Sequence, residues 1–339
     1  MGLNEKFFKS AAGGITASDN FAPVLYTGNW NGSNTNTVEV GFRPDWIWIK
    51  RRDGADGHHL YDSVRGMGKP LYSNTTGAEN ASNHVNTTST GFTLVTDNVN
   101  QNGNLFIAWC WKAGGAAVLN EDGTLDSQVS ANVDAGFSIV SYTGASANQN
   151  VGHGLDETPQ LIIVKNRDTA GNGWATQSPF SGGADYHMML NLTQEAKNNV
   201  DWIWNDTEPT SSVFSIGENG ITNTSGNKYI GYCFHSVDFY QKVGSYTGGG
   251  SNLTVINVGF APTMVLFKCT SNAGSTWRIF DTVRGTDKSI TVNSSLAEYD
   301  DATNYVDFTS TGFEFNRSVT QANPDINGSG RTYIYLAIA

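Results

Sequence analysis

The chain has 339 residues and a formal net charge of −11, and only 15% of its residues are charged. It lacks the clustered Lys and Arg that contacts to phosphate require, which argues against a nucleic-acid partner. No run of about eighteen apolar residues occurs, and the start has no basic and then apolar secretion pattern. We therefore expect a soluble protein made in the cytoplasm, without membrane insertion.

Residues 1–20 read as an N-terminal arm. Phe7 and Phe8 are bulky and apolar, and Gly13-Gly14 follows them, which is typical of a docking peptide on a flexible tether. Phe7 and Phe8 are therefore candidates for anchoring the chain to a larger assembly.

The body of the chain repeats one pattern three times. Each copy begins with a Tyr-Thr-Gly element, and the three tyrosines lie 116 and 104 residues apart: Tyr26, Tyr142 and Tyr246. With 38 glycines and many Asn, Ser and Thr residues, the composition is typical of a turn-rich all-β protein. We predict three tandem antiparallel β-sandwich repeats, of jelly-roll or lectin-like type, over 21–115, 116–238 and 239–339. A string of domains and a ring with pseudo-threefold symmetry are both compatible with this pattern.

Individual strands and one helix can be predicted inside the repeats. The segments 45–50, 160–165 and 263–268 are apolar on both faces, so each should be a central strand covered on both sides. The segments 91–96 and 137–142 alternate in part, which favours strands with one face in water. Thr193 followed by Gln-Glu-Ala-Lys predicts a short helix or turn within 192–200.

A charged element recurs in the first and third copies. Asp62 and Arg65 stand three residues apart before a glycine, as do Asp281 and Arg284. Such a pair can fix a loop, and we favour this role over an active site. The second copy has Gln-Ser-Pro-Phe at this place, from Gln177 onwards.

The residues that usually form catalytic or metal sites do not assemble into a convincing motif. The six histidines lack metal-binding spacing and are interpreted as loop or surface residues. Cys110 and Cys233 are interpreted as small buried hydrophobic residues, and Cys269, at the end of a strand, has no CxxC partner. The oxygen-rich loop that starts at Asp97 could hold calcium, but it has no ordered ligand ladder. We assign neither a metal nor a cofactor.

Aromatic residues give the strongest functional indication. His58, Trp174 and Trp277 fall at matching places in the three copies, and Trp30 lies in a loop rich in Gly and Asn. Sugars bind to flat rings flanked by polar side chains, so Trp30, Trp174 and Trp277 are glycan-binding candidates. Packing in the core is the alternative role for these rings.

The ordered motifs resemble a known family. Tyr-Thr-Gly, then Asp45-Trp-Ile-Trp-Ile-Lys50, then Asp62-Ser-Val-Arg65-Gly and the closing run from Leu105 to Trp111 are similar to virion proteins of tailed bacteriophages, common in marine phages. Members of that family are treated as tail-fibre or other structural proteins with lectin-like β domains. The resemblance covers the chain from about residue 21 and implies a location in the virion, with other virion proteins as partners.

Three functions follow as expectations. The first is a non-enzymatic, surface-exposed virion protein, tail-associated and adhering to host-surface polysaccharide, with Phe7 and Phe8 anchoring it to the particle. The second is a capsid decoration protein that stabilises the head at a threefold or quasi-threefold position. The third, a depolymerising glycosidase, would need two carboxylates such as Asp53, Asp56 or Asp62 to face one groove.

Overall fold

The computed structural model describes residues 15–198, 202–250, 253–300, 306–315 and 325–339. Over these ranges the chain is nearly all β, in antiparallel sheets, which confirms the predicted fold class. None of the helices in these ranges is long and apolar enough to cross a membrane. They are η1 (Ala17–Asp19), η2 (Asp97–Val99), η3 (Pro179–Ser181), η4 (Gly183–Asp185) and α1 (Gly220–Asn223).

Three larger sheets, here called the first, second and third inner sheets, share an order of four strands. The first has the order β1 (Phe21–Thr27), β7 (Leu105–Trp111), β3 (Trp46–Arg51) and β4 (His58–Asp62). The second has the matching order β10 (Phe137–Thr143), β17 (Lys228–Phe234), β12 (Leu161–Asn166) and β13 (Trp174–Gln177). The third has β18 (Gln241–Thr247), β26 (Thr332–Ile338), β20 (Met264–Cys269) and β21 (Arg278–Asp281).

Further strands extend two of these sheets. Beyond β13 lie β14 (Tyr186–Met189) and β15 (Lys197–Asn198), and beyond β10 lie β9 (Ser127–Asn132) and β8 (Val118–Asn120). Beyond β21 lie β22 (Lys288–Thr291) and β23 (Tyr299–Asp300).

A small outer sheet covers one face of each inner sheet. The first consists of β2 (Asn36–Glu39), β6 (Gly91–Leu94) and β5 (Val85–Thr87). The second consists of β11 (Gln149–Gly152) and β16 (Val213–Ile216), and the third of β19 (Thr254–Asn257), β25 (Gly312–Phe315) and β24 (Asp307–Thr309).

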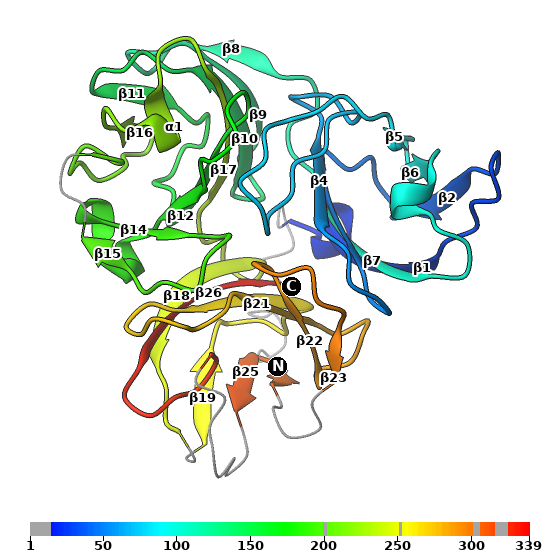
Figure 1. Cartoon of the computed structure of the whole chain (residues 1–339). Helices are drawn as coiled ribbons and strands as arrows, with labels where there is room; N and C mark the ends of the chain where they lie inside the picture. Colours follow the sequence, from blue (N-terminus) through cyan, green and yellow to red (C-terminus); the bar gives the residue numbers. More distant parts are fainter. Residues whose placement is uncertain (1–14, 199–201, 251–252, 301–305, 316–324) are drawn as a thin grey trace, which may run out of the picture.

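The inner sheets surround one common hydrophobic core. In Figure 1 the blue, green and yellow-to-red sheets face a shared centre, and the outer sheets lie at the periphery. The central cluster draws large side chains from all three sheets, among them Trp46, Tyr232 and Leu266. The rings of Trp46 and Tyr232 stack across two sheets with centroids 4.3 Å apart. Three separate clusters fill the spaces between inner and outer sheets. The units therefore bury their inner faces against one another instead of each forming an independent core.

The three landmark tyrosines have the same surroundings. The hydroxyls of Tyr26, Tyr142 and Tyr246 donate to backbone carbonyls at 2.8, 2.8 and 2.5 Å. Each ring stacks on an aromatic ring of the neighbouring strand, with interplanar angles of 7°, 10° and 9°. The glycine two residues later has no room for a side chain, because a Cβ there would overlap a backbone oxygen. These contacts explain why the Tyr-Thr-Gly element recurs, while the predicted domain boundaries stay a prediction.

The central strands are covered on both faces, as predicted. β12 and β20 are buried throughout, and β3 is buried except at Arg51. Partial exposure holds for β6, where Thr93 is half-buried, and for β10, where Ser141 is half-buried. In β10, Phe137 and Ile139 enter the central core, whereas Val140 and Tyr142 enter the outer core. Before Ser141, the alternation along β10 therefore separates two cores.

Two local predictions fail for tertiary reasons. The helix, one of the two alternatives for 192–200, is not found in its described part: the chain bends at Leu192 and runs without regular structure into β15, because the Ala196 N–H donates to the Thr270 carbonyl of the third inner sheet at 2.8 Å. Residues 15–20 also belong to the body rather than to a free arm. Ile15 and Ala17 pack against the central core, and the Asn20 carbonyl accepts from the Lys112 N–H at 2.9 Å.

Candidate functional site

The three inner sheets are joined by three seams, each formed where a loop of one sheet meets the central strand of the next. Matching backbone hydrogen bonds mark all three. They run from Glu79 N to Arg167 O at 2.7 Å, from Ala196 N to Thr270 O at 2.8 Å and from Glu298 N to Arg52 O at 2.8 Å. The order is first to second, second to third and third to first, so the contacts close a cycle. We name the seams by the sheets that they join.

The matching aromatic positions lie in these seams. The Trp174 indole donates to Tyr72 O and the Trp277 indole to Met189 O, both at 3.0 Å. His58 makes the equivalent contact with Thr291 O, also at 3.0 Å. Trp174 and Trp277 are 0% and 1% exposed. Their assignment as glycan-binding candidates is therefore wrong, because a buried ring cannot stack on a sugar, and both residues join neighbouring sheets.

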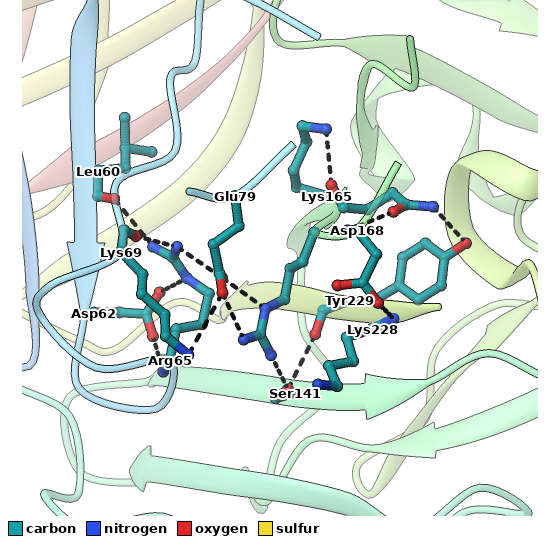
Figure 2. A network of polar contacts seen from close by, with 12 residues as sticks. Leu60, Asp62, Arg65, Lys69, Glu79, Ser141, Lys165, Asp168, Lys228 and Tyr229 are labelled. Atoms are coloured by element: carbon teal, nitrogen blue, oxygen red, sulfur yellow. Dashed lines mark hydrogen bonds and ion pairs between the residues drawn. The ribbon is translucent and has the colours of Figure 1, made fainter. Parts of the chain in front are cut away.

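A line of charged groups crosses the first–second seam (Figure 2). Asp62 and Arg65, fully buried, pair at 2.5 Å, which confirms the predicted loop-fixing pair. Arg65 also contacts the Glu79 carboxylate at 3.3 Å, and Arg167 of the second sheet binds the same carboxylate through two bonds of 2.8 and 3.1 Å. Burial alone would raise the pKa of Glu79, but the hydrogen bonds and charges of Arg167 and Arg65 lower it. The carboxylate is thus held ionised between two cations.

The third–first seam carries the same line of charges. Arg284 binds Asp281 at 2.7 Å and contacts Glu298 at 3.3 Å. Arg52 of the first sheet binds Glu298 through bonds of 2.9 and 3.0 Å. A ring of the adjoining sheet donates to the aspartate in both seams: Trp109 to Asp281 at 3.0 Å, and Tyr232 to Asp62 at 2.8 Å. We call each of these lines a seam relay. The charged groups of both relays bind partners within the protein, which fits a structural role.

Three equivalent lysines are buried beside the seams. Lys50, Lys165 and Lys268 are 0% exposed, and each ammonium group donates to the backbone carbonyl of the next residue, at 2.6 to 2.8 Å. Burial lowers the pKa of each to about 8. A lowered pKa can accompany catalysis, but its occurrence in all three sheets indicates a role in the fold.

The histidines are buried rather than at the surface, which corrects the sequence interpretation. Burial lowers the pKa of His58 to about 3 and that of His153 to about 4. Below their ordinary pKa near 6.5, these side chains take up protons in the unfolded chain before they do so in the folded protein. Stability should therefore be greatest above pH 6.5 and fall as the pH drops from 6.5 towards 4.

The double variant Trp48→Leu, His58→Trp tests this pH dependence. The other sheets have Ile163 with Trp174 and Leu266 with Trp277 at the matching places, so the pair should fit. We expect the loss of unfolding free energy between pH 6 and pH 5 to shrink by about 1.2 kcal/mol, slightly less than the contribution of one full proton. Urea unfolding at both pH values measures it. An unchanged pH dependence in a folded variant would contradict the assignment.

An exposed tryptophan that sequence reasoning missed lies at the second outer sheet. Trp202 is 64% exposed, and its backbone carbonyl accepts from the Asn219 N–H at 2.8 Å. Among the described residues, this outer sheet has two strands where the others have three, and the segment containing Trp202 precedes β16. The pocket beside it has a volume of about 720 Å3 and is lined by Asn148, Trp202, Asn205, Glu218, Asn219 and Gly220. We call it the Trp202 pocket.

The remaining candidate positions are less informative. Trp30 is half-buried, and its backbone N–H donates to the Asn100 carbonyl at 2.9 Å. Its assignment to glycan binding stays a prediction. Phe7 and Phe8 lie outside the described residues.

In the loop considered for calcium, the Asn100 side chain is already bonded to Asn29 and Asn36. Within the described ranges, no group of three His, Cys, Asp or Glu residues could hold a metal ion.

The carboxylates and cysteines have structural partners or surroundings. Asp53 binds Arg51 at 2.8 Å, and Asp56 lies 3.7 Å from His59, whereas Asp62 is part of a seam relay. All three cysteines are buried and free, which confirms the interpretation of Cys110 and Cys233 as small buried residues. Burial raises the pKa of the Cys233 thiol to about 12.

The fold and its seams define a β-sandwich protein in which three alike sheets close around one core. The chain belongs to DUF7483, a domain family of unknown function whose model matches residues 16–339. No curated protein matches the chain. The family description names no activity, so function must be argued from the sites themselves.

Proposed function

We propose that this chain is a non-enzymatic structural protein of a tailed-bacteriophage virion, exposed on the particle surface and adhering to glycans of the host. Its motifs resemble those of phage virion proteins, and the chain would reach the particle after synthesis in the host cytoplasm. Association with the tail, together with other virion proteins, is part of this proposal.

The Trp202 pocket carries the adhesive part of the proposal. An exposed indole offers a flat apolar face, and the neighbouring Asn148, Asn205 and Asn219 offer amide donors and acceptors. A pyranose ring needs both, one for its C–H face and the other for its hydroxyls. The volume of about 720 Å3 lies within the range of about 300–1,000 Å3 of small-molecule sites. Several copies on one particle would convert weak binding into avidity.

Trp202→Ala should weaken binding to host cells and to their isolated surface polysaccharide by about tenfold, which corresponds to about 1.4 kcal/mol of lost stacking. The fold should persist, because the side chain is mostly in solvent. Phe239→Ala, which removes a ring that is 68% exposed and lies outside the Trp202 pocket, is the matched control and should bind normally. Equal binding by both variants would argue against adhesion through this pocket.

Decoration of the head is the second candidate, and the closed cycle of seams favours it. Three alike sheets around one axis could match a threefold or quasi-threefold position and contact neighbouring capsid subunits. A low-resolution map of the particle with this protein labelled separates the two candidates. Density on the tail supports adhesion, and density at threefold positions of the head supports decoration.

A further inference from the structure

The second–third seam lacks the relay that the other two seams contain. Matching strand registers and seam hydrogen bonds identify the equivalent positions. Where the first–second seam has Asp62, Arg65, Glu79, Arg167 and Tyr232, the second–third seam has Ser178, Ser181, Ala196, Thr270 and Leu336. The strand register thus puts Ser178, rather than Gln177, at the place of Asp62. Every charged position of the relay is uncharged here.

The rest of this seam is intact. Ala196 N still donates to Thr270 O at 2.8 Å, Gly274 N to Thr193 O at 2.9 Å, and the Trp277 indole to Met189 O at 3.0 Å. The sheets therefore meet here as they do elsewhere. Only the charged side chains that would fill the space between them are missing.

A groove of about 590 Å3 occupies that place. Ser181, Ala196 and Thr270, three of the replaced positions, line it directly together with Phe180 and Tyr186. Ser245, the counterpart of the Ser141 that binds Arg167 in the first–second seam, lines it as well. Phe180 and Tyr186 are half-buried, and Ser245 is exposed. The lining is thus built from aromatic rings and hydroxyl groups.

The charges around the groove select against ionic ligands. Among the described residues that line it, none is Lys or Arg, so an anion would find no cation there. Its one carboxylate, Glu195, pairs through Oε1 with Lys197, which balances its charge, and its Oε2 is left to accept a hydrogen bond. Hydroxyl groups such as those of Ser181, Ser245 and Thr247 both donate and accept hydrogen bonds, as sugar hydroxyls require.

We propose that this groove, the seam groove, is a binding site for a neutral saccharide, separate from the Trp202 pocket. The rings of Phe180 and Tyr186 supply apolar contact with a sugar face, and the surrounding hydroxyls supply hydrogen bonds. The groove lies at the one of three equivalent seams that lacks the charged side chains of the relay. The inference does not depend on the protein belonging to a virion.

The double variant Ala196→Glu, Thr270→Arg tests the proposal by restoring the central pair of the relay. The backbone bond between these residues matches that between Glu79 and Arg167, so the new pair should form and fill the groove. An array of neutral oligosaccharides first identifies a ligand of the full chain, and titration calorimetry then measures its affinity. We expect binding at the seam groove to fall at least tenfold, with a melting temperature equal to or above that of the native chain.

Two companion variants make the result specific. Ala196→Ser, Thr270→Ser keeps the groove open and uncharged, and should bind normally. Trp202→Ala removes the other candidate pocket and should also leave this binding unchanged, so failure of the adhesion proposal and failure of this one are distinguishable. The proposal is overturned if the Glu–Arg variant folds and binds as tightly as the native chain, if all saccharide binding is lost in Trp202→Ala, or if the native chain binds no neutral saccharide. Displacement of the saccharide by an extended peptide pairing with the edge of β18 would equally overturn it.

Discussion

Asp62→Asn is expected to lower the free energy of unfolding by about 3–5 kcal/mol, because it leaves the buried guanidinium of Arg65 without its closest counter-charge. Both side chains of this pair are fully buried, and the same carboxylate also accepts from the Tyr232 hydroxyl at 2.8 Å. The amide keeps the shape of the carboxylate, so the effect reports on charge rather than on packing. Urea unfolding monitored by tryptophan fluorescence measures it.

Two further variants bracket this result. Asp281→Asn removes the equivalent charge in the third–first seam, where Asp281 and Arg284 are also fully buried, and should cost a similar amount. Asp53→Asn breaks the ion pair between Asp53, whose side chain is 32% exposed, and Arg51, whose side chain is 24% exposed. It should lower the free energy of unfolding by less than about 1 kcal/mol. If Asp62→Asn proved as mild as Asp53→Asn, the seam relay would not contribute to holding the sheets together.

Trp46→Ala should cost about 3–5 kcal/mol and loosen two sheets at once. Trp46 belongs to the first inner sheet and is 1% exposed, yet its ring stacks on Tyr232 and Phe137 of the second. Hydrogen exchange should therefore accelerate in β10 and β17 as well as in β3. Trp202→Ala removes the same kind of side chain from an exposed position and should change stability by about 0.5 kcal/mol or less. Faster exchange confined to the first sheet would contradict a shared core.

Much of the architecture could be predicted because local sequence and local structure agree. The apolar strand that ends at Lys50 and its counterparts that end at Lys165 and Lys268 are covered on both faces, as their composition indicates. The pairing of Asp62 with Arg65 followed from their spacing and the glycine after them. Such features depend on neighbours within one strand or loop.

The predictions are wrong where contacts with another sheet determine the local structure. Trp174 and Trp277 lie among polar residues in the sequence, but their indoles are buried and donate to backbone carbonyls of the preceding sheet unit, those of Tyr72 and Met189. Residues 192–198 favour a helix locally, yet Ala196 bonds to the third sheet instead. Neither contact is encoded by periodicity within the segment itself.

The candidate sites were harder to predict than the fold. Trp202 stands next to an Asn- and Asp-rich segment that departs from the other two copies, and that departure was a signal present in the sequence. The seam groove can be recognised only when equivalent positions of the three seams are compared. The presence of Ser181 at the place of Arg65 has no visible meaning until the structure shows what Arg65 binds.

Calorimetric unfolding of the full chain tests most directly whether three sheets form one cooperative body. A shared core and a closed cycle of seams predict a single transition, with a calorimetric enthalpy equal to the van't Hoff enthalpy. Two or three resolved transitions, each with the enthalpy of a single sandwich, would contradict the account and indicate independent domains on a string.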